Sequence, residues 1–481
     1  MPSDTHEIVF DGGADRVGPA TWSQREILAT MGRLPGRHAH FNLNIPVPVP
    51  ARTSLEQVRS AIRQLVEHHE SLRTTMVVDP NGQTHQSVHG RGRVRLTSFH
   101  DGDPGNPTSE PEVVRAGQAT PVGFAGEDCI RTDLFSGSGI SVVRLTVSHV
   151  ALDGFGIAVL QEDLRRLLHG EQLASPSIDP LTRAEYEAAL TGQARSARSL
   201  AQASAHLRTA PRPFMGYRSP ADGRAGSHWV GQVHSGALGS ALGMLSASTG
   251  LPPSAILIAV AGTVLAEKAE AGAFTALVVS SNRFEPLLRR YVGTLFQAVP
   301  ITVDVVPADC LATAAVAART VAGAHVRGQF DPGGLERLVG DLEQESGHAA
   351  HPWLTFNVHL PAPDSRSAPT ESDLRLRLGR STYESRSMWG IEEPGVYLTA
   401  LGDGDSVVLT LRANTSRLSI SEAEELLLAV ECRTVELVLG TASGMTGGAR
   451  FATKADLAIC ACADQHRQAT QDSADGTDSS P

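Results

Sequence analysis

The chain has 481 residues, of which 41% are hydrophobic, and its net charge is −11 at pH 7. This length predicts two to four domain-sized units, and an acidic balance without a basic run argues against nucleic-acid partners and anionic membrane surfaces. The longest apolar stretch, 255–266, is too short to span a bilayer and the N-terminal residues do not resemble a secretory signal, so the sequence predicts a cytoplasmic protein with no membrane contact.

The number and positions of the cysteines and lysines argue against several classes of protein. The five scattered cysteines do not form a disulfide framework, and Cys460 and Cys462 lack a second ligand pair for zinc. Lysine occurs only at positions 268 and 454, so the chain has no P-loop motif and almost no candidate for a Schiff base. It also lacks the G-x-S-x-G motif of nucleophile-elbow hydrolases. We therefore expect no metal and no tightly bound cofactor.

In chain order, the polar and Gly-rich residues 1–18 are predicted to be a flexible lead-in. Hydrophobic periodicity and turn residues then define the elements up to the middle of the chain. They are a helix at 21–34, an extended edge segment at 41–49, a helix at 54–70, a hairpin of 74–78 and 84–88, a loop at 101–122, a strand at 140–149 and a helix at 155–168.

The junction of that last strand and helix carries the most informative motif. Val143, Leu145 and Val147 alternate with polar residues, so His149 continues the apolar face and Ser148 points to the opposite side. Four residues after the histidine, an Asp-Gly pair opens the helix. A strand, a sharp turn and a helix can present one reactive side chain from a rigid frame. A core histidine that donates to a backbone carbonyl is the structural alternative.

The second half of the chain repeats the mixture of helices and strands after a Pro- and Gly-rich linker at 208–226. Helices are predicted at 237–249, 253–269, 310–327 and 419–438, and strands at 275–281, 299–305, 353–360, 395–401 and 406–413. The fold class is therefore α/β (α+β) with two lobes, at 19–207 and 227–455. Residues 456–481 are predicted to be a disordered polar tail.

Five collinear motifs resemble those of nonribosomal peptide synthetase condensation domains. Residues 147–156 resemble the H-H-x-x-x-D-G core of that family. The other four are at 21–27, 67–76, 291–300 and 353–358. This chain departs from the pattern at Ser148, where the first histidine is usual, and at Gln297, where asparagine is usual. The shorter H-x-x-x-D-G form belongs to the wider chloramphenicol-acetyltransferase-like superfamily.

The resemblance implies a fold and a set of partners. The fold would be two chloramphenicol-acetyltransferase-like lobes arranged as a V-shaped pseudo-dimer around a central tunnel. The chain would be a free-standing condensation enzyme that meets acyl or peptidyl carrier proteins in trans. It would transfer an acyl group from a phosphopantetheine thioester to an amine, or less readily to a hydroxyl.

The resemblance also assigns roles to residues. The catalytic set would be His149, Asp153 and Gly154, with His149 as the general base for the acceptor. N–H groups of the turn at Asp153 and Gly154 could stabilise the oxyanion. The family pattern pairs Asp153 with Arg73 in a structural ion pair. Three further side chains are candidates for the lining of the cleft, namely Ser148, Gln297 and Asn357.

Two other functions remain open at this point. One is an O-acyltransferase of the same superfamily that uses a coenzyme A or carrier thioester and a small-molecule acceptor. The other is a non-catalytic module that keeps the fold and recruits a tailoring enzyme or carrier. The intact histidine and Asp-Gly pair favour catalysis.

Overall fold

The structure of the chain is a computed structural model. It describes residues 4–33, 41–81, 83–100, 122, 130–137, 140–175, 178–218, 227–360, 370–389, 395–403 and 405–442. Most of the predicted loop at 101–122 and the whole predicted tail at 456–481 therefore lie outside the described residues.

The chain divides into two compact units, and neither is one continuous segment. Unit 1 comprises residues 1–200, 281–297 and 327–335, and unit 2 comprises the remainder. The predicted lobes were continuous, so they did not anticipate that two segments from the second half belong to unit 1. The predicted linker at 208–226 contains the end of α6 and a short helix, α7, in its described part.

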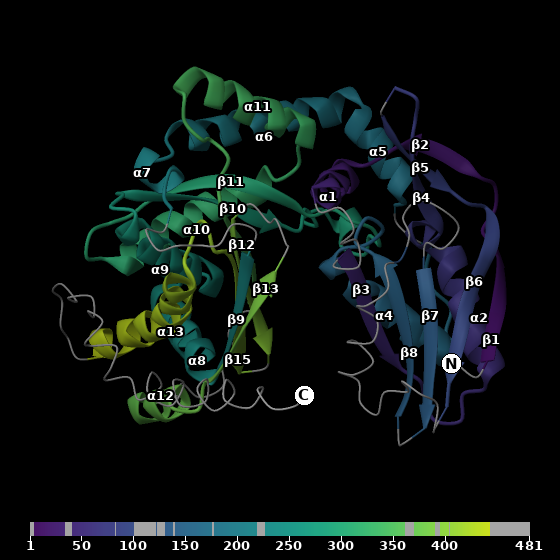
Figure 1. Cartoon of the computed structure of the whole chain (residues 1–481). Coiled ribbons are helices and arrows are strands. Elements are labelled where there is room, and N and C mark those ends of the chain that lie inside the picture. The colour runs from purple at the N-terminus through teal and green to yellow at the C-terminus, as the bar shows by residue number, and fades with distance from the viewer. Residues whose placement is uncertain are drawn as a thin grey trace, which may run out of the picture. The chain divides into compact units, whose positions relative to one another are not determined.

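Unit 1 is built on a five-stranded sheet in the order β1-β6-β7-β8-β3 and a three-stranded sheet in the order β2-β5-β4 (Figure 1). The strands are β1 (Asp4–Asp11), β2 (Arg16–Pro19), β3 (Asn42–Pro48), β4 (Thr74–Val78), β5 (Thr84–Val88), β6 (Arg91–Phe99), β7 (Ile130–Gly137) and β8 (Ile140–Ser148). The helices are α1 (Trp22–Gly32), α2 (Leu55–His68), the 3-10 helices η2 (Glu70–Arg73) and η3 (Pro286–Leu288), α4 (Gly154–Leu168), α5 (Pro180–Ala188) and most of α6 (Leu190–Arg208).

The predicted flexible lead-in is wrong. Residues 4–11 form β1, which pairs with β6 in antiparallel fashion along its whole length, and residues 16–19 form β2. Ile8 and Phe10 on β1 are buried in the core of unit 1. Strand β6 was itself not predicted, and a polar strand such as β1 becomes stable only when it has a partner of this kind.

The core of unit 1 lies between the five-stranded sheet and helices α2 and α4, which contact each other and the sheet (Figure 1). On β8 the residues Val143, Leu145 and Val147 are fully buried in this core, as the alternation predicts. The opposite face of β8 is also buried. There Arg144 is paired with Asp133, at 2.5 Å between Nη2 and Oδ2. Strand β8, which leads to His149, is therefore held by apolar packing on one face and by a buried ion pair on the other.

Several predicted elements of unit 1 are confirmed in detail. Helix α1 lies within the range predicted for it, 21–34, and it is capped by Thr21, whose side chain forms a capping box with Gln24. Strand β3 is an edge strand, as its prolines predict. The hairpin of β4 and β5 is antiparallel.

Unit 2 is built on a seven-stranded sheet in the order β11-β10-β12-β14-β15-β9-β13, with helices packed against it (Figure 1). Its strands are β9 (Ser227–Ser235), β10 (Ala273–Ser280), β11 (Gln297–Asp304), β12 (Leu354–His359), β13 (Thr382–Trp389), β14 (Val396–Asp403) and β15 (Ser406–Asn414). Its helices are α7 (Arg212–Met215), α8 (Gly236–Thr249), α9 (Pro253–Lys268), α10 (Cys310–Val326), most of α11 (Pro332–Ser346), α12 (Glu371–Leu378) and α13 (Ile420–Ala442).

The apolar stretch at 255–266 lies within α9, which matches the helix predicted at 253–269, and it is buried throughout. Among the described residues, no single helix is both long enough and apolar enough to cross a membrane. Helices α8 and α9 satisfy that test only when taken together, and they are bent by 110° at the break between them.

Candidate active site

The turn between β8 and α4 holds His149 through backbone hydrogen bonds. The His149 N–H donates to the Phe41 carbonyl at 2.8 Å, and the Ala151 N–H donates to the Ser148 carbonyl at 2.9 Å. Val150 and Leu152 are buried on either side of the turn. The histidine is thus anchored by the residue before the edge strand β3 and by buried neighbours in the turn.

Asp153 is the cap of α4 and its carboxylate is fully used by donors within unit 1. Its Oδ1 accepts the Gly156 N–H at 3.0 Å. Its Oδ2 accepts Arg283 Nη1 at 2.8 Å, the Leu295 N–H at 2.8 Å and the Phe296 N–H at 3.3 Å. The side chain is 1% exposed. A carboxylate with four donors is a positioning group, which agrees with its predicted structural role but not with a place among the reacting groups.

The predicted pair of Asp153 and Arg73 is wrong, since the cation that pairs with Asp153 is Arg283. Arg283 also donates to the carbonyls of Ser281, Tyr291 and Gly293, and its guanidinium lies over the Phe155 ring at 5.6 Å. Arg283 therefore fastens the 281–297 segment to the turn that bears His149. The two partners are 130 residues apart in the chain, so their pairing left no local signal in the sequence.

Arg73 is buried elsewhere in unit 1, at the end of η2. It donates to the carbonyls of His89 and Gly12 and to Glu70 Oε1, the last at 3.3 Å. It supports β5 and the chain after β1 rather than the turn that carries the histidine. The error arose because a buried arginine in the second motif can satisfy its charge locally, with a glutamate three residues before it.

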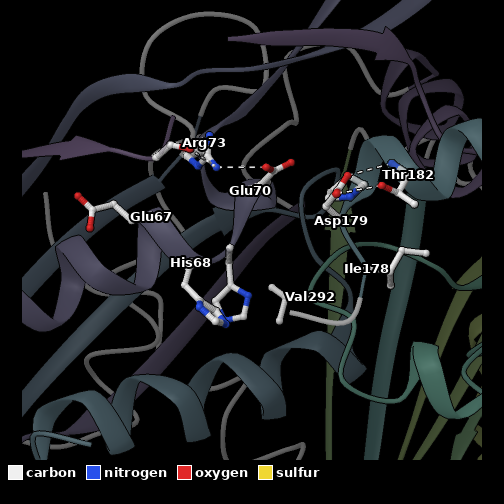
Figure 2. A pocket seen from close by; sticks show the side chains of 11 residues that line it. Glu67, His68, Glu70, Arg73, Ile178, Asp179, Thr182 and Val292 are labelled. Carbon is white, nitrogen blue, oxygen red and sulfur yellow. Dashed lines mark hydrogen bonds and ion pairs between the residues drawn. The ribbon is translucent and has the colours of Figure 1, made fainter. Parts of the chain in front are cut away.

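Arg73 lies beside a pocket of about 410 Å³ in unit 1, whose lining does not include His149 or Asp153 (Figure 2). Figure 2 shows Glu70 turned toward Arg73, with Asp179 and Thr182 bonded to each other on another wall. The side chains that line the pocket are those of Glu67, His68, His69, Glu70, Arg73, Ile178, Asp179, Pro180, Thr182 and Val292, together with Gly12.

The two adjacent histidines of this pocket differ in burial, since His69 is buried and His68 is half-buried. His69 is 6% exposed and bonds Asp163 through Nε2 at 3.0 Å. His68 packs edge-on against the His69 ring, and burial lowers the pKa of its imidazole. In the part of the chain that the structure describes, no group of three or more His, Cys, Asp or Glu side chains could hold a metal ion.

The His149 imidazole lies in a mostly apolar environment. Its ring centroid is 5.1 Å from that of Phe296, with the planes tilted by 55°. Nδ1 is buried and makes no hydrogen bond, although backbone groups of His149 and Leu152 lie near enough to favour the protonated form slightly. The residue nevertheless keeps part of its surface exposed. The alternative of a core histidine requires a hydrogen bond from the ring to a backbone carbonyl, and Nδ1 makes none.

Burial is the largest influence on the pKa of His149 and lowers it below the ordinary value of 6.5, against the opposing effect of backbone groups and Asp153. If the neutral imidazole is the base, kcat/KM should be constant above pH 6.5 and should fall only at lower pH. This is checked by measuring kcat/KM against pH with an aromatic amine acceptor that stays unprotonated. A midpoint at or above pH 6.5 would contradict the assignment.

Gly154 leaves open space at the first position of α4. A Cβ built there meets no atom within 4 Å, whereas one at Gly156 would lie 2.4 Å from Leu152 Cδ1. The Gly156 N–H is already used by Asp153, so it is not available to an oxyanion. The N–H groups of the first turn have no partner within the helix, and the first of them is that of Gly154. Gly154 is therefore the candidate oxyanion donor that we retain.

We expect Gly154→Ala to fold normally, with a free energy of unfolding within about 1 kcal/mol of wild type, because the added methyl enters empty space. We also expect kcat/KM to fall by about tenfold or more, since the methyl would occupy the approach to the turn. Parallel melting curves and initial rates check this. Unchanged rates would show that the substrate does not use this space.

The three predicted cleft residues have different outcomes. Ser148 is buried and its Oγ accepts the Val150 N–H at 3.4 Å, so it contributes to the turn. Gln297 is wrong as a cleft residue, because its side-chain amide is buried and bonds both backbone groups of Phe330. Asn357 lies on β12 in unit 2 with a buried, unpartnered Oδ1, and its role stays a prediction.

These features define the class of protein. The sequence model of the condensation domain matches residues 16–389, so the chain belongs to the condensation-domain family. Domains of this family act in nonribosomal peptide and polyketide synthetases. They are generally amide-forming acyltransferases that work with carrier-protein domains and phosphopantetheine-borne substrates.

The curated relatives are synthetases of which this chain spans less than a tenth. Fusarin C synthetase of Gibberella moniliformis is 26% identical over 177 residues, which is 36% of this chain and 4% of that protein. Fumosorinone synthetase of Cordyceps fumosorosea is 25% identical over 356 residues, which is 70% of this chain and 8% of that protein.

Solved structures confirm the fold. The condensation domain of the monacolin K polyketide synthase MokA has a TM-score of 0.68 at 14% identity, covering 89% of this chain and 98% of that one. The SgcC5 protein of Streptomyces globisporus has a TM-score of 0.65 at 19% identity, covering 87% and 99%. The X-domain solved in complex with OxyB, from teicoplanin biosynthesis, has a TM-score of 0.62 at 17% identity, covering 87% and 93%. The predicted α/β fold of the chloramphenicol-acetyltransferase type is thus correct.

Proposed function

We propose that this chain transfers an acyl group from a carrier-protein thioester, supplied in trans, to an amine acceptor. One observation supports this above the others: His149 is held in a fixed turn by backbone hydrogen bonds, while Nδ1 of its imidazole makes no hydrogen bond and the residue stays partly exposed. A retired site would not need its turn to be fixed by a carboxylate with four donors.

The chemistry follows from the side chains of unit 1. The neutral imidazole takes a proton as the acceptor nitrogen forms its bond to the thioester carbonyl carbon. The Gly154 N–H, at the positive end of α4, stabilises the negative charge on the carbonyl oxygen. The tetrahedral intermediate then breaks its carbon–sulfur bond, and the pantetheine thiolate accepts the proton from His149. The amide and the free thiol leave, and the imidazole is neutral again.

Asp153 and Arg283 would act by position alone in this scheme. They hold the turn and the 281–297 segment in register, because the Asp153 carboxylate accepts four N–H donors and Arg283 is bonded through Nη1 and Nη2. The guanidinium stays protonated and takes no proton. A hydroxyl acceptor would follow the same sequence of steps and give an ester.

The test uses the purified chain, an acylated carrier protein as donor and a carrier-bound amine as acceptor, each as a separate polypeptide. We expect a mass-spectrometric amide product that appears only when the chain is present. Equal use of coenzyme A thioesters and a small hydroxyl acceptor would instead identify an O-acyltransferase.

A recruitment module is the second candidate, because a structure of similar fold is an X-domain solved in complex with OxyB. The same assay separates the two functions when carrier binding is measured beside product formation. Carrier binding with no product from any donor and acceptor pair would favour recruitment and overturn the catalytic proposal.

A further inference from the structure

The side chain that lies against the His149 ring is a phenylalanine from a distant part of the chain. The Phe296 ring is 5.1 Å from it, and Phe296 and His149 are both partly exposed. The Phe296 N–H also donates to Asp153 Oδ2, at 3.3 Å. The carboxylate that fixes the histidine turn therefore holds the backbone of Phe296 as well, and the Phe296 ring lies next to the imidazole.

The ring of Phe296 belongs to an apolar wall. Phe296, Phe41 and Leu28 are the partly buried members, and they pack on a buried layer of five side chains from α1, the residue after β2, β4 and the turn. The buried members are Ala20, Ile27, Met31, Met76 and Val150. Because the wall is backed by buried side chains, a group seated on it would lose contact with water on that side.

The charges around His149 favour an uncharged substrate group over a positively charged one. A free ammonium group beside His149 would need a carboxylate partner to offset its desolvation. The carboxylate fixed in this turn belongs to Asp153, and its two oxygens already accept four N–H donors. A charged aminoacyl group would thus gain no ion pair with Asp153, whereas an alkyl or aryl group would gain contact with Phe296.

We infer that Phe296 is a specificity-determining residue and that the substrate group seated beside His149 is an uncharged, apolar acyl substituent. This inference rests on the proposed acyl transfer, since it concerns the donor of that reaction. It adds that an unsubstituted alkyl or aryl acyl group is preferred over a free aminoacyl group of the same size.

The test measures binding of non-hydrolysable amide analogues of acyl pantetheine to the full-length chain by calorimetry. The propionyl and glycyl analogues form a matched pair, because they have the same number of heavy atoms and differ by a methyl in place of an ammonium. We expect the propionyl analogue to bind at least about tenfold more tightly. The butyryl analogue should bind up to about fourfold more tightly again, the value for one fully buried methylene.

The variant Phe296→Ala should reduce the ratio of glycyl to propionyl dissociation constants by at least about fivefold, mainly through weaker binding of the propionyl analogue. Phe284→Ala is the matched control, because Phe284 belongs to the same segment but is 54% exposed. That control should keep the wild-type ratio. If Phe296→Ala does not fold, Phe296→Gln serves instead and should reduce the ratio in the same direction, because it places a polar side chain beside His149. Phe296→Leu should retain the preference, because it keeps an apolar side chain.

The binding measurements test the apolar preference, and the carrier-protein assay tests the proposed acyl transfer, so the two can fail independently. Equal binding of the two matched analogues, tighter binding of the glycyl analogue, or no binding of either would overturn the inference. So would an unchanged ratio in Phe296→Ala. The carrier-protein assay stands apart from these outcomes: amide formation with no analogue preference would leave the proposed function intact. Tighter binding of the propionyl analogue without any amide formation would support the apolar subsite but contradict the proposed acyl transfer.

Discussion

Replacement of His149 by alanine should lower kcat/KM for acyl transfer by about 10²- to 10⁴-fold, the range typical for loss of a general base. The ring makes no hydrogen bond that holds the fold, because Nδ1 is unpartnered and the backbone of the turn is held by its own N–H groups. The substitution should therefore remove the proton acceptor while α4 and the turn keep their places.

The measurement is the initial rate of amide formation with saturating carrier-bound acceptor, together with a melting curve for each protein. His68→Ala is the matched control, since it removes a half-buried histidine from the pocket beside Arg73 and leaves His149 in place. We expect that control to keep its rate within about threefold, because the residue has no part in the proposed proton transfer. Equal rates for wild type and His149→Ala would falsify the assignment of the base.

Replacement of Arg283 by methionine should produce the largest loss of stability among the site residues. The pair with Asp153 is almost completely buried, at 6% and 1% exposure of the two side chains. Removal of one partner from a buried ion pair costs about 3–5 kcal/mol, because the other charge stays buried without compensation. Transfer activity should also be lost, since the 281–297 segment would no longer be fastened to the histidine turn.

A double-mutant cycle isolates this pair from the rest of the fold. Asp153→Asn combined with Arg283→Met should be more stable than the sum of the two single losses predicts, because the uncompensated charge is gone. Arg208→Met provides the control: Arg208 pairs with Glu345 with both side chains 54% exposed, and its loss should cost less than about 1 kcal/mol. Coupling of Asp153 to Arg73 rather than to Arg283, measured by urea unfolding, would contradict the pairing described above.

Local patterns in the sequence predicted the parts of the site that local interactions build. The alternation along 140–148 placed Val143, Leu145 and Val147 in the core, and the capping residue Asp153 marked the start of α4. The spacing between His149 and the Asp-Gly pair depends only on the turn that joins β8 to α4. Such features are settled by neighbours within a few residues, and the sequence displays them directly.

Strands β1, β6 and β7 were not predicted, and the organisation of unit 1 was therefore missed. Strands β6 and β7 lie beside each other in parallel, and β1 completes the sheet from the N-terminus. A parallel or terminal strand depends on a partner distant in the chain, so its own residues carry little signal.

The sequence by itself determined the motif, the residue that can act as the base and the elements that carry it, because strand and helix periodicity and capping act over short distances. Only the tertiary structure decided what surrounds that base. Asp153 takes its cation from position 283 and the imidazole takes its aromatic neighbour from position 296. A buried charge is satisfied by whichever opposite charge the fold brings within hydrogen-bond distance, and that choice depends on the packing of segments more than a hundred residues apart.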